Sequence, residues 1–380
     1  MHRPWIVFVA MNRNADVTAG LEAYERHDWK GAYELLSPLL KSKEDSPELV
    51  EVLGAVSWWV GDIDTTIDAR QRAYAGYSSN GQTIDAARIA TKLAEDHLHR
   101  LQSSTANGWL RKAKRLLEDA PVVPEQGHLV RLEAVLASGR QGGLQEAIDL
   151  STRVHEIGIE LADVDLQMLG LHDRGRFLVA VGEVDDGVAM MEEAMVSAVA
   201  GELTPMVTGR IFCNMIEVCS RMADFGRAIE WSDQAMRWCE GLGSAGGYPG
   251  VCRVRRSEFM RLRGAWPEAE AEAKQAVNDL SDLLPYMGGA FNEIGMVRLN
   301  MGDLDGAGEA FRKAHSLGLT PQPGLALLRL AEGSAAEALS MIQSGLESIE
   351  ELHTRSMLLP AAVEIALAAS DVSSAREHAS

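Results

Sequence analysis

The stretch Gly302-Asp303-Leu304-Asp305-Gly306-Ala307 decides the fold, because it can end one helix and begin the next. Glycine readily adopts the left-handed conformation that terminates a helix. An aspartate side chain can accept hydrogen bonds from the free amides that open a helix. Apolar residues recur at three- and four-residue intervals on both sides, as in Ile294 and Val297 before the stretch and Phe311 and Ala314 after it. The sequence here predicts two amphipathic helices joined by a tight turn.

Related phrases recur along the whole chain, for example at residues 264–269 and 223–228. Their last small residue defines ten anchors at intervals of 31 to 41 residues: Ala32, Thr66, Ala106, Ala147, Gly187, Ala228, Ala269, Ala307, Ala338 and Ala375. A glycine often lies five residues before the anchor: Gly61, Gly142, Gly182, Gly264, Gly302 and Gly333. Capping aspartates follow at Asp28, Asp62, Asp224, Asp303 and Asp371. A repeat of this period predicts an array of helix hairpins.

Small residues also recur at two other positions of the repeat. Twelve residues before the anchor stand Gly20, Gly54, Ala94, Gly175, Ser257 and Gly295, and seven after it stand Ala73, Ala113, Ala194, Ala235, Ala276, Ala314 and Gly345. Small side chains let neighbouring helices approach closely. These positions resemble the tetratricopeptide (TPR) pattern. An alanine-rich bundle without true repeats would not keep glycine, cap and anchor in register.

The predicted fold is all-α: a TPR-like α-solenoid of about ten antiparallel helix hairpins forming a curved superhelix. We expect residues 15–380 to form one continuous solenoid and residues 1–14 to be a poorly ordered leader. The clusters at 120–124, 241–250 and 319–324, rich in proline and glycine, are expected to be loops between repeats. Only five residues follow Ala375, which suggests that the solenoid is truncated within its last hairpin.

Composition limits the classes of function. The 380 residues are 46% hydrophobic, and 36 basic against 55 acidic residues give a formal net charge of -19. This charge repels phosphate backbones and anionic headgroups, so we expect no direct nucleic-acid or membrane binding. The four cysteines are too irregularly spaced for a disulfide framework or a zinc site, which favours a reducing cytoplasm. The apolar run at 4–11 is too short to span a membrane.

No reaction centre can be assembled from the sequence. Residues 241–246 match the dinucleotide fingerprint, but they follow a helical segment where a strand would be needed. His97 and His99 would point to different faces of a helix, and the pair His155-Glu156 lacks the second histidine of a metalloprotease helix. The chain is therefore predicted to be no enzyme and to need no metal or cofactor.

Two basic clusters call for separate interpretations. Residues 111–115 are expected to form a solvated outer face of a second helix. The arginines at 253–263 could instead meet an acidic or phosphate-bearing partner.

Longer phrases between the anchors resemble a known group of proteins. They lie at 107–113, 201–209, 230–239, 263–269 and 321–330. With the anchors aligned, residues 15–380 resemble the helical sensor region of MalT-like and LuxR-type bacterial transcriptional regulators, and the similar repeats of some nucleotide cyclases. The resemblance implies a regulatory region. The sequence contains neither a phosphate-loop signature nor a basic terminal helix pair, so the DNA binding of that family is not expected of this chain.

The first helices of such hairpins line a groove, and we expect a row of polar residues there to be free of packing. Fourteen and eleven residues before successive anchors stand the candidate groove-binding residues: Lys92, Glu95, Glu133, Asp173, Arg176, Asn214, Glu217, Arg255, Glu258 and Glu293. A mixed-charge row suits a protein or peptide partner, or a small inducer, and self-association is compatible with it. The alternatives are a stand-alone adaptor or scaffold, a cyclase regulatory region, and an enzyme with an unfamiliar deep pocket.

Overall fold

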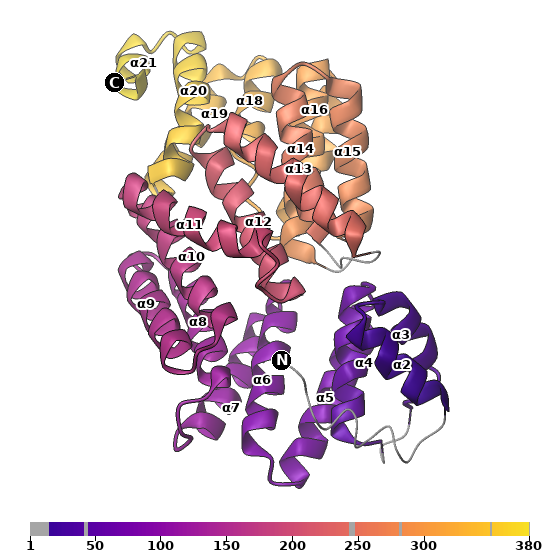
Figure 1. The fold of residues 1–380 in the computed structure, drawn as a ribbon. Coiled ribbons are helices and arrows are strands. Elements are labelled where there is room, and N and C mark those ends of the chain that lie inside the picture. The colour runs from indigo at the N-terminus through magenta and orange to yellow at the C-terminus, as the bar shows by residue number, and fades with distance from the viewer. Residues whose placement is uncertain (1–14, 42–44, 243–247, 281–282, 350–351, 380) are drawn as a thin grey trace. The chain divides into compact units, whose positions relative to one another are not determined.

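The computed structural model describes residues 15–41, 45–242, 248–280, 283–349 and 352–379. These residues form twenty α-helices, and no strand occurs among them. Successive helices pair as antiparallel hairpins (Figure 1). The all-α prediction of stacked hairpins is confirmed. The chain divides into two compact units: unit 1 contains residues 1–129 and 236–249, and unit 2 contains residues 130–235 and 250–380.

Six helices lie wholly in unit 1: α2 (Ala15–Glu25), α3 (Trp29–Leu36), α4 (Pro47–Trp59), α5 (Ile63–Ser79), α6 (Thr83–His99) and α7 (Ser103–Leu117). Three helices contain the unit boundaries: α8 (Pro124–Ser138), α13 (Phe225–Gly241) and α14 (Tyr248–Leu262).

The remaining helices belong to unit 2. They are α9 (Leu144–Glu160), α10 (Val164–Val181), α11 (Val184–Val199), α12 (Pro205–Arg221), α15 (Trp266–Asp279), α16 (Leu284–Met301), α17 (Leu304–Ser316), α18 (Gly324–Ala331), α19 (Ala335–Ser348), α20 (Leu352–Ala368) and α21 (Val372–Ala379).

The hairpin turns have the predicted geometry. All six predicted turn glycines have positive φ, between 69° at Gly142 and 99° at Gly182. Asp303 Oδ1 accepts a hydrogen bond of 3.0 Å from the Gly306 amide and so caps α17. The other four predicted aspartates each accept a hydrogen bond from the amide three residues later. The prediction of turn and cap from the repeat phrase is confirmed.

The small residues of the repeat lie where the helices touch. All ten anchors are buried, and eight of them are alanines with at most 5% exposure. The backbones of α10 and α11 are so close that a Cβ atom added at Gly175 would lie 2.5 Å from the carbonyl oxygen of Gly187. In α16 a Cβ atom at Gly295 would lie 2.4 Å from the fully buried ring of Phe311. The small side chains therefore set the distance between neighbouring helices.

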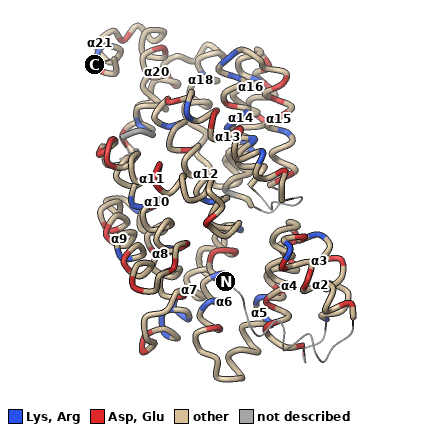
Figure 2. Tube along the Cα trace, in the orientation of Figure 1, with Lys and Arg blue, Asp and Glu red and all other residues tan. Residues whose placement is uncertain are grey.

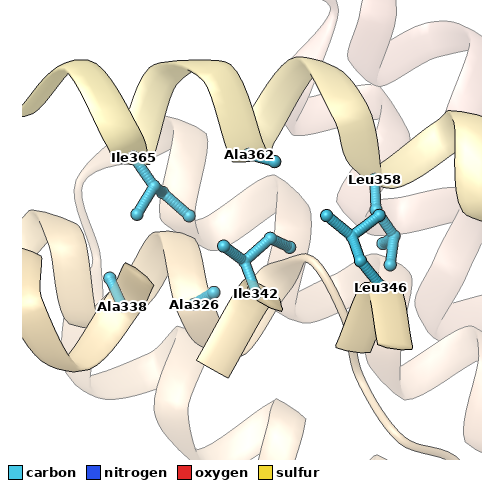
Figure 3. Close-up of a cluster of buried hydrophobic side chains, with 7 residues drawn as sticks. All are labelled: Ala326, Ala338, Ile342, Leu346, Leu358, Ala362 and Ile365. Atoms are coloured by element: carbon cyan, nitrogen blue, oxygen red, sulfur yellow. The ribbon is translucent and has the colours of Figure 1, made fainter. Parts of the chain in front are cut away.

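Larger apolar side chains fill the space that the small residues leave. In the last hairpins, Ile342 and Leu346 of α19 meet Leu358 and Ile365 of α20, with Ala326 of α18 beneath them (Figure 3). Burying each of these aliphatic side chains stabilises the fold by about 1.5–3 kcal/mol. Alanines complete this cluster, as they do those of the other hairpins.

Within unit 2, helix α20 also contacts two helices that are far from it in the sequence. Helix α20 contacts α10 and α12 in addition to its neighbours α18, α19 and α21. The last hairpins therefore reach the middle of the chain.

The segment 241–250 was expected to be a loop, but α14 already begins at Tyr248 and includes Pro249 and Gly250. Proline is tolerated there because the amides of the first helical turn have no partner within the helix.

The expected leader at 1–14 lies outside the described residues. In the part of the chain that the structure describes, no helix is long and apolar enough to cross a bilayer.

Candidate functional site

The ten predicted groove residues lie on the first helices of successive hairpins. Helix α6 of unit 1 carries Lys92 and Glu95. In unit 2 the others are Glu133 on α8, Asp173 and Arg176 on α10, Asn214 and Glu217 on α12, Arg255 and Glu258 on α14, and Glu293 on α16. Charged residues of both signs occur along these helices (Figure 2).

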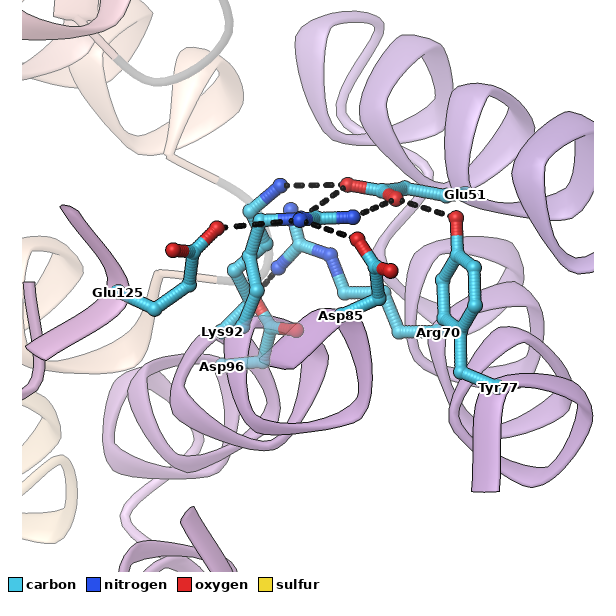
Figure 4. Close-up of polar contacts among 8 residues, drawn as sticks. Glu51, Arg70, Tyr77, Asp85, Lys92, Asp96 and Glu125 are labelled. Atoms are coloured by element: carbon cyan, nitrogen blue, oxygen red, sulfur yellow. Dashed lines mark hydrogen bonds and ion pairs between the residues drawn. The ribbon is translucent and has the colours of Figure 1, made fainter. Parts of the chain in front are cut away.

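In unit 1, Lys92 belongs to an ion cluster around Glu51 of α4 (Figure 4). Glu51 is 4% exposed and accepts hydrogen bonds from Tyr77 Oη at 2.8 Å and from Arg88 Nη2 at 2.8 Å. Burial and the adjacent carboxylate raise the pKa of Tyr77. Arg88 also pairs with Glu125, so the cluster joins α4, α5, α6 and the first turn of α8.

In unit 2, Asp173 is the centre of a second ion cluster. It is 1% exposed and lies 2.8 Å from Nε of both Arg131 and Arg176. Burial alone would raise the pKa of Asp173, but the two guanidinium groups hold it far below its usual range. The neighbouring His172 is fully buried, and burial lowers its pKa. Asp173 therefore stays ionised and is shared by two arginines.

The row continues through α12 and α14. Glu217 Oε1 lies 2.6 Å from Arg221 and 3.8 Å from Arg255. Burial would raise its pKa, but the positive charges of Arg221, Arg255 and Arg176 lower it to about 2. Glu258 accepts hydrogen bonds from Ser220 at 2.9 Å and from Arg255 at 3.2 Å. An ion pair and a hydrogen bond therefore connect the successive first helices α12 and α14.

At the next helix, Glu293 forms an ion pair with Arg261, and both side chains are largely buried. Burial raises the pKa of Glu293, and the nearby Glu258 adds to this effect, although Arg261 opposes it. Within unit 2, Asp173, Arg176, Glu217, Arg255, Glu258 and Glu293 therefore form one charged row.

The expectation that these side chains are free of packing is wrong for three of them. Asp173, Glu258 and Glu293 are at most 7% exposed and pair with arginines of unit 2. The helices approach so closely that polar side chains between them become desolvated, and buried carboxylates then need cationic partners. Arg176, Asn214, Glu217 and Arg255 keep partial exposure.

A cavity of about 600 Å³ lies beside this row in unit 2. Arg176, Asn214 and Glu217 of the predicted set line it. Its other walls come from residues 138–144, which join α8 to α9, and from residues 347–349 at the end of α19. Three successive hairpins and one distant segment thus form a pocket of the size that binds small ligands.

Two arginines that complete the row, Arg131 and Arg221, were not predicted from the sequence, and Arg261 was predicted only as part of a basic cluster. Arg131, Arg221 and Arg261 hold Asp173, Glu217 and Glu293. A local signal existed for Arg221, which follows Glu217 by one helical turn and so lies on the same face. The pairs of Arg131 and Arg261 join residues of different hairpins and have no local signal.

The remaining candidate motifs have structural roles or lie outside the described part. His97 is buried, with Nδ1 2.6 Å from Gln102 Oε1, and His155 Nδ1 lies 2.9 Å from the Gln167 carbonyl oxygen. Residues 243–246 of the glycine motif are not described. Among the described residues, no group of three His, Cys, Asp or Glu side chains could hold a metal ion.

The two basic clusters differ in their surroundings. The four basic residues of 111–115 are exposed on α7, as expected, and Lys112 Nζ lies 4.8 Å from the Trp109 ring centroid. In the second cluster, internal carboxylates pair with Arg253, Arg255, Arg256 and Arg261. Most of this second cluster is therefore neutralised within the chain.

Comparison with known proteins supports the fold. No protein-family model and no curated protein matches the sequence. Among solved structures, the chain is similar to a Rap protein complexed with competence and sporulation factor, with a TM-score of 0.61 at 12% identity, over 87% of this chain and 95% of that one. Yeast Tom70 matches with a TM-score of 0.40 at 11% identity, over 95% of this chain and 96% of that one.

A STAND protein with a tetratricopeptide-repeat sensor from Pyrococcus horikoshii also matches, with a TM-score of 0.41 at 16% identity, over 75% of this chain and 43% of that one. The match to the Rap protein, at 12% identity, shows the fold alone. The chain has a tetratricopeptide-like helical-repeat fold.

Proposed function

We propose that the chain is a non-enzymatic interaction and sensing module, and that the charged row and cavity of unit 2 are its binding site. Repeat folds of this class present rows of side chains from successive hairpins to extended partners. The main support for this site is one cavity of about 600 Å³, which is lined from two successive first helices by Arg176, Asn214 and Glu217. The solved Rap protein of similar fold carries a bound factor, which supports a peptide or protein partner here.

The proposal includes a regulatory role, as part of a LuxR- or MalT-type transcriptional regulator whose output domain lies outside residues 1–380. The resemblance of the phrases between the anchors supports this assignment. A stand-alone adaptor and a cyclase regulatory region are the alternative settings for the same module. The gene sequence that follows the Ser380 codon distinguishes them, because a regulator or cyclase would encode its output domain in frame.

The binding site is tested by affinity capture with the full chain as bait in a lysate of the source organism. Asn214→Arg places a long charged side chain in the cavity, whereas Glu193→Arg makes a comparable change at an exposed position of α11. We expect partners captured by the parent protein to be retained by Glu193→Arg and lost by Asn214→Arg. Unchanged helical circular dichroism would verify that both variants fold. Equal capture by the two variants would refute the site.

A further inference from the structure

Unit 2 contains a further cavity of about 770 Å³, the α15–α17 pocket, which is lined by residues of α15, α16 and α17. Helices α15 and α17 are second helices of successive hairpins, and α16 is the first helix between them, beside α15 (Figure 1). Phe291, Ile294 and Arg298 of α16 line the pocket. Glu293 of the charged row follows Phe291 by two residues and so lies on nearly the opposite side of this helix. The pocket is therefore separate from the site proposed above.

The corresponding place among α5, α6 and α7 of unit 1 is closed by two aromatic rings. Tyr74 of α5 stands eight residues after the anchor Thr66, and Trp109 of α7 stands three residues after the anchor Ala106. Their ring centroids lie 4.9 Å apart in a T-shaped contact, and both side chains pack against the buried cluster of these hairpins. Aromatic rings in this geometry attract each other in addition to being buried. The contact therefore bridges the two second helices.

Between α15 and α17 the same two positions hold the smaller residues Val277 and Ala310, and both line the pocket. Phe291 stands where α6 has Ala90, so one ring is present where the other place has two. The position of Ala310 carries a large side chain, packed against the core, in three other hairpins: Trp109, Leu150 and Met341. The α15–α17 pocket therefore exists because the side chain that fills this place elsewhere is reduced to a methyl group.

Cationic side chains border the apolar base of the pocket. Arg312 and Lys313 of α17 line it and are exposed, and among the described residues no carboxylate forms an ion pair with either. Lys313 Nζ lies 6.0 Å from the centroid of the Phe291 ring. Lys112, at the corresponding position of α7, lies 4.8 Å from the Trp109 ring centroid. A cation therefore lies over an aromatic ring at both places, but at α17 the space beside the ring is open.

The remaining charges leave the pocket positive. Lys274 and Arg298 also line it, and they share Glu270 at 3.0 Å and 2.8 Å. Arg298 is also 4.0 Å from Asp303, and Glu309 is exposed in the lining. With all of these groups counted, four cationic side chains stand against three carboxylates. The excess of positive charge favours an anionic ligand.

We infer that the α15–α17 pocket binds a small aromatic carboxylate. The ring of the ligand occupies the place that corresponds to the Trp109 ring and lies against Phe291 and Val277. Its carboxylate pairs with Arg312 and Lys313, because a planar carboxylate accepts two parallel hydrogen bonds from a guanidinium group. A cavity of about 770 Å³ is of the size that holds small ligands. This site is additional to the proposed function and does not depend on it.

Equilibrium dialysis of the intact protein against indole-3-propionate tests the inference, because this probe joins the ring of tryptophan to a carboxylate. We expect saturable binding of one molecule per chain with a Kd of about 1 mM or lower, the affinity usual for a ligand of this size. The neutral indole-3-propionamide should bind at least about fivefold more weakly. Absence of saturable binding, or equal affinity for the acid and the amide, would overturn the inference.

Two substitutions fill the pocket with side chains that other repeats carry at the same position. Ala310→Trp copies Trp109, and Ala310→Met copies Met190 and Met341. We expect Ala310→Trp to abolish binding of indole-3-propionate and Ala310→Met to weaken it at least about fivefold. Circular dichroism verifies folding, and Ala310→Met decides the question if the tryptophan variant does not fold. Undiminished binding by a folded variant would show that the probe lies elsewhere.

A pair of double variants tests the role of charge. Arg312→Gln/Lys313→Gln removes the two cations of the pocket that have no described ion pair. Arg111→Gln/Lys112→Gln is the matched control, because it removes the corresponding pair on α7, where Trp109 fills the space. We expect the first double variant to bind indole-3-propionate about fivefold more weakly and the control to bind it unchanged. An equal loss in both would indicate general charge attraction, and the inference would fail.

The inference and the proposed function can fail separately. Asn214→Arg, which obstructs the cavity beside the charged row, should leave binding of indole-3-propionate unchanged. If Asn214→Arg abolishes this binding, the probe occupies that cavity and the inference is wrong. If it abolishes only the capture of partners, both the proposed function and the separate pocket are supported.

Discussion

At the scale of single residues, the absence of a side chain matters as much as its presence. A Cβ atom at Gly170 would lie 2.3 Å from the backbone nitrogen of His155, so α9 and α10 touch at their backbones there. Gly108, within α7, has open space around the same position. The two glycines have opposite roles although both lie inside helices.

We therefore predict opposite effects of the same substitution at these two positions. Gly170→Ala should lower the free energy of unfolding by about 2 kcal/mol, because one of the two backbones must move. Gly108→Ala should raise it by about 0.5–1 kcal/mol, since alanine favours the helix. Urea unfolding followed by circular dichroism measures both. A stabilised Gly170→Ala protein would show that the close packing of α9 and α10 is wrong.

The burial of the small repeat residues could be predicted from the sequence, but the ion pairs of the charged groove residues could not. An anchor such as Ala307 is recognised because its repeat neighbours are local in sequence. The environment of Asp173 depends on Arg131, which lies in another hairpin and becomes a neighbour only after folding. Likewise, Ile349 reaches the cavity from the end of α19, and no local pattern predicts that contact.

At the scale of helices, most of the second helices begin in the same way but differ in their caps. Asp303 and Ala265 occupy equivalent N-cap positions, with φ of -80° and -83°. The aspartate caps α17 through the Gly306 amide, whereas no side-chain bond caps α15. Comparing α17 with α15 therefore isolates the contribution of a side-chain cap to the stability of a helix.

We predict that Asp303→Ala lowers the free energy of unfolding by about 1 kcal/mol, and that Ala265→Asp raises it by a similar amount. The new aspartate can accept a hydrogen bond from the Glu268 amide, three residues later, as Asp303 does from Gly306. Thermal unfolding of the two variants measures the changes. Asp303→Asn keeps a capping oxygen and should stay within a few tenths of the parent value. A loss of about 1 kcal/mol in Asp303→Asn would show that charge, and not the cap, is responsible.

At the scale of the whole molecule, acid should weaken the fold through the charged row. The pKa of Glu217 is lowered to about 2 in the folded chain, against an ordinary value of 4.5. A carboxyl with a lowered pKa stabilises the folded state above its ordinary pKa, and this contribution is lost as the pH falls towards the lowered value. Asp173 acts in the same direction, and Glu293, whose pKa is raised, acts in the opposite direction.

We predict that the urea midpoint of the parent protein falls between about pH 4.5 and pH 2, and that it falls less steeply in Glu217→Gln. The variant should be less stable than the parent at pH 7 and approach it at pH 2, where Glu217 of the parent becomes protonated. Urea titrations at several pH values measure both curves. Parallel curves would show that Glu217 does not have a lowered pKa.

Because α20 contacts α10 and α12, the stability of unit 2 differs from that of a strictly linear array of hairpins. In a strictly linear array, each hairpin interacts only with its two neighbours, and the stability is a sum over adjacent pairs. Contacts between hairpins that are not adjacent add a contribution to this stability, and that contribution depends on the whole array being folded. Damage to the final hairpins is thereby transmitted to the walls of the cavity, so the integrity of the chain's end is coupled to the properties of its centre.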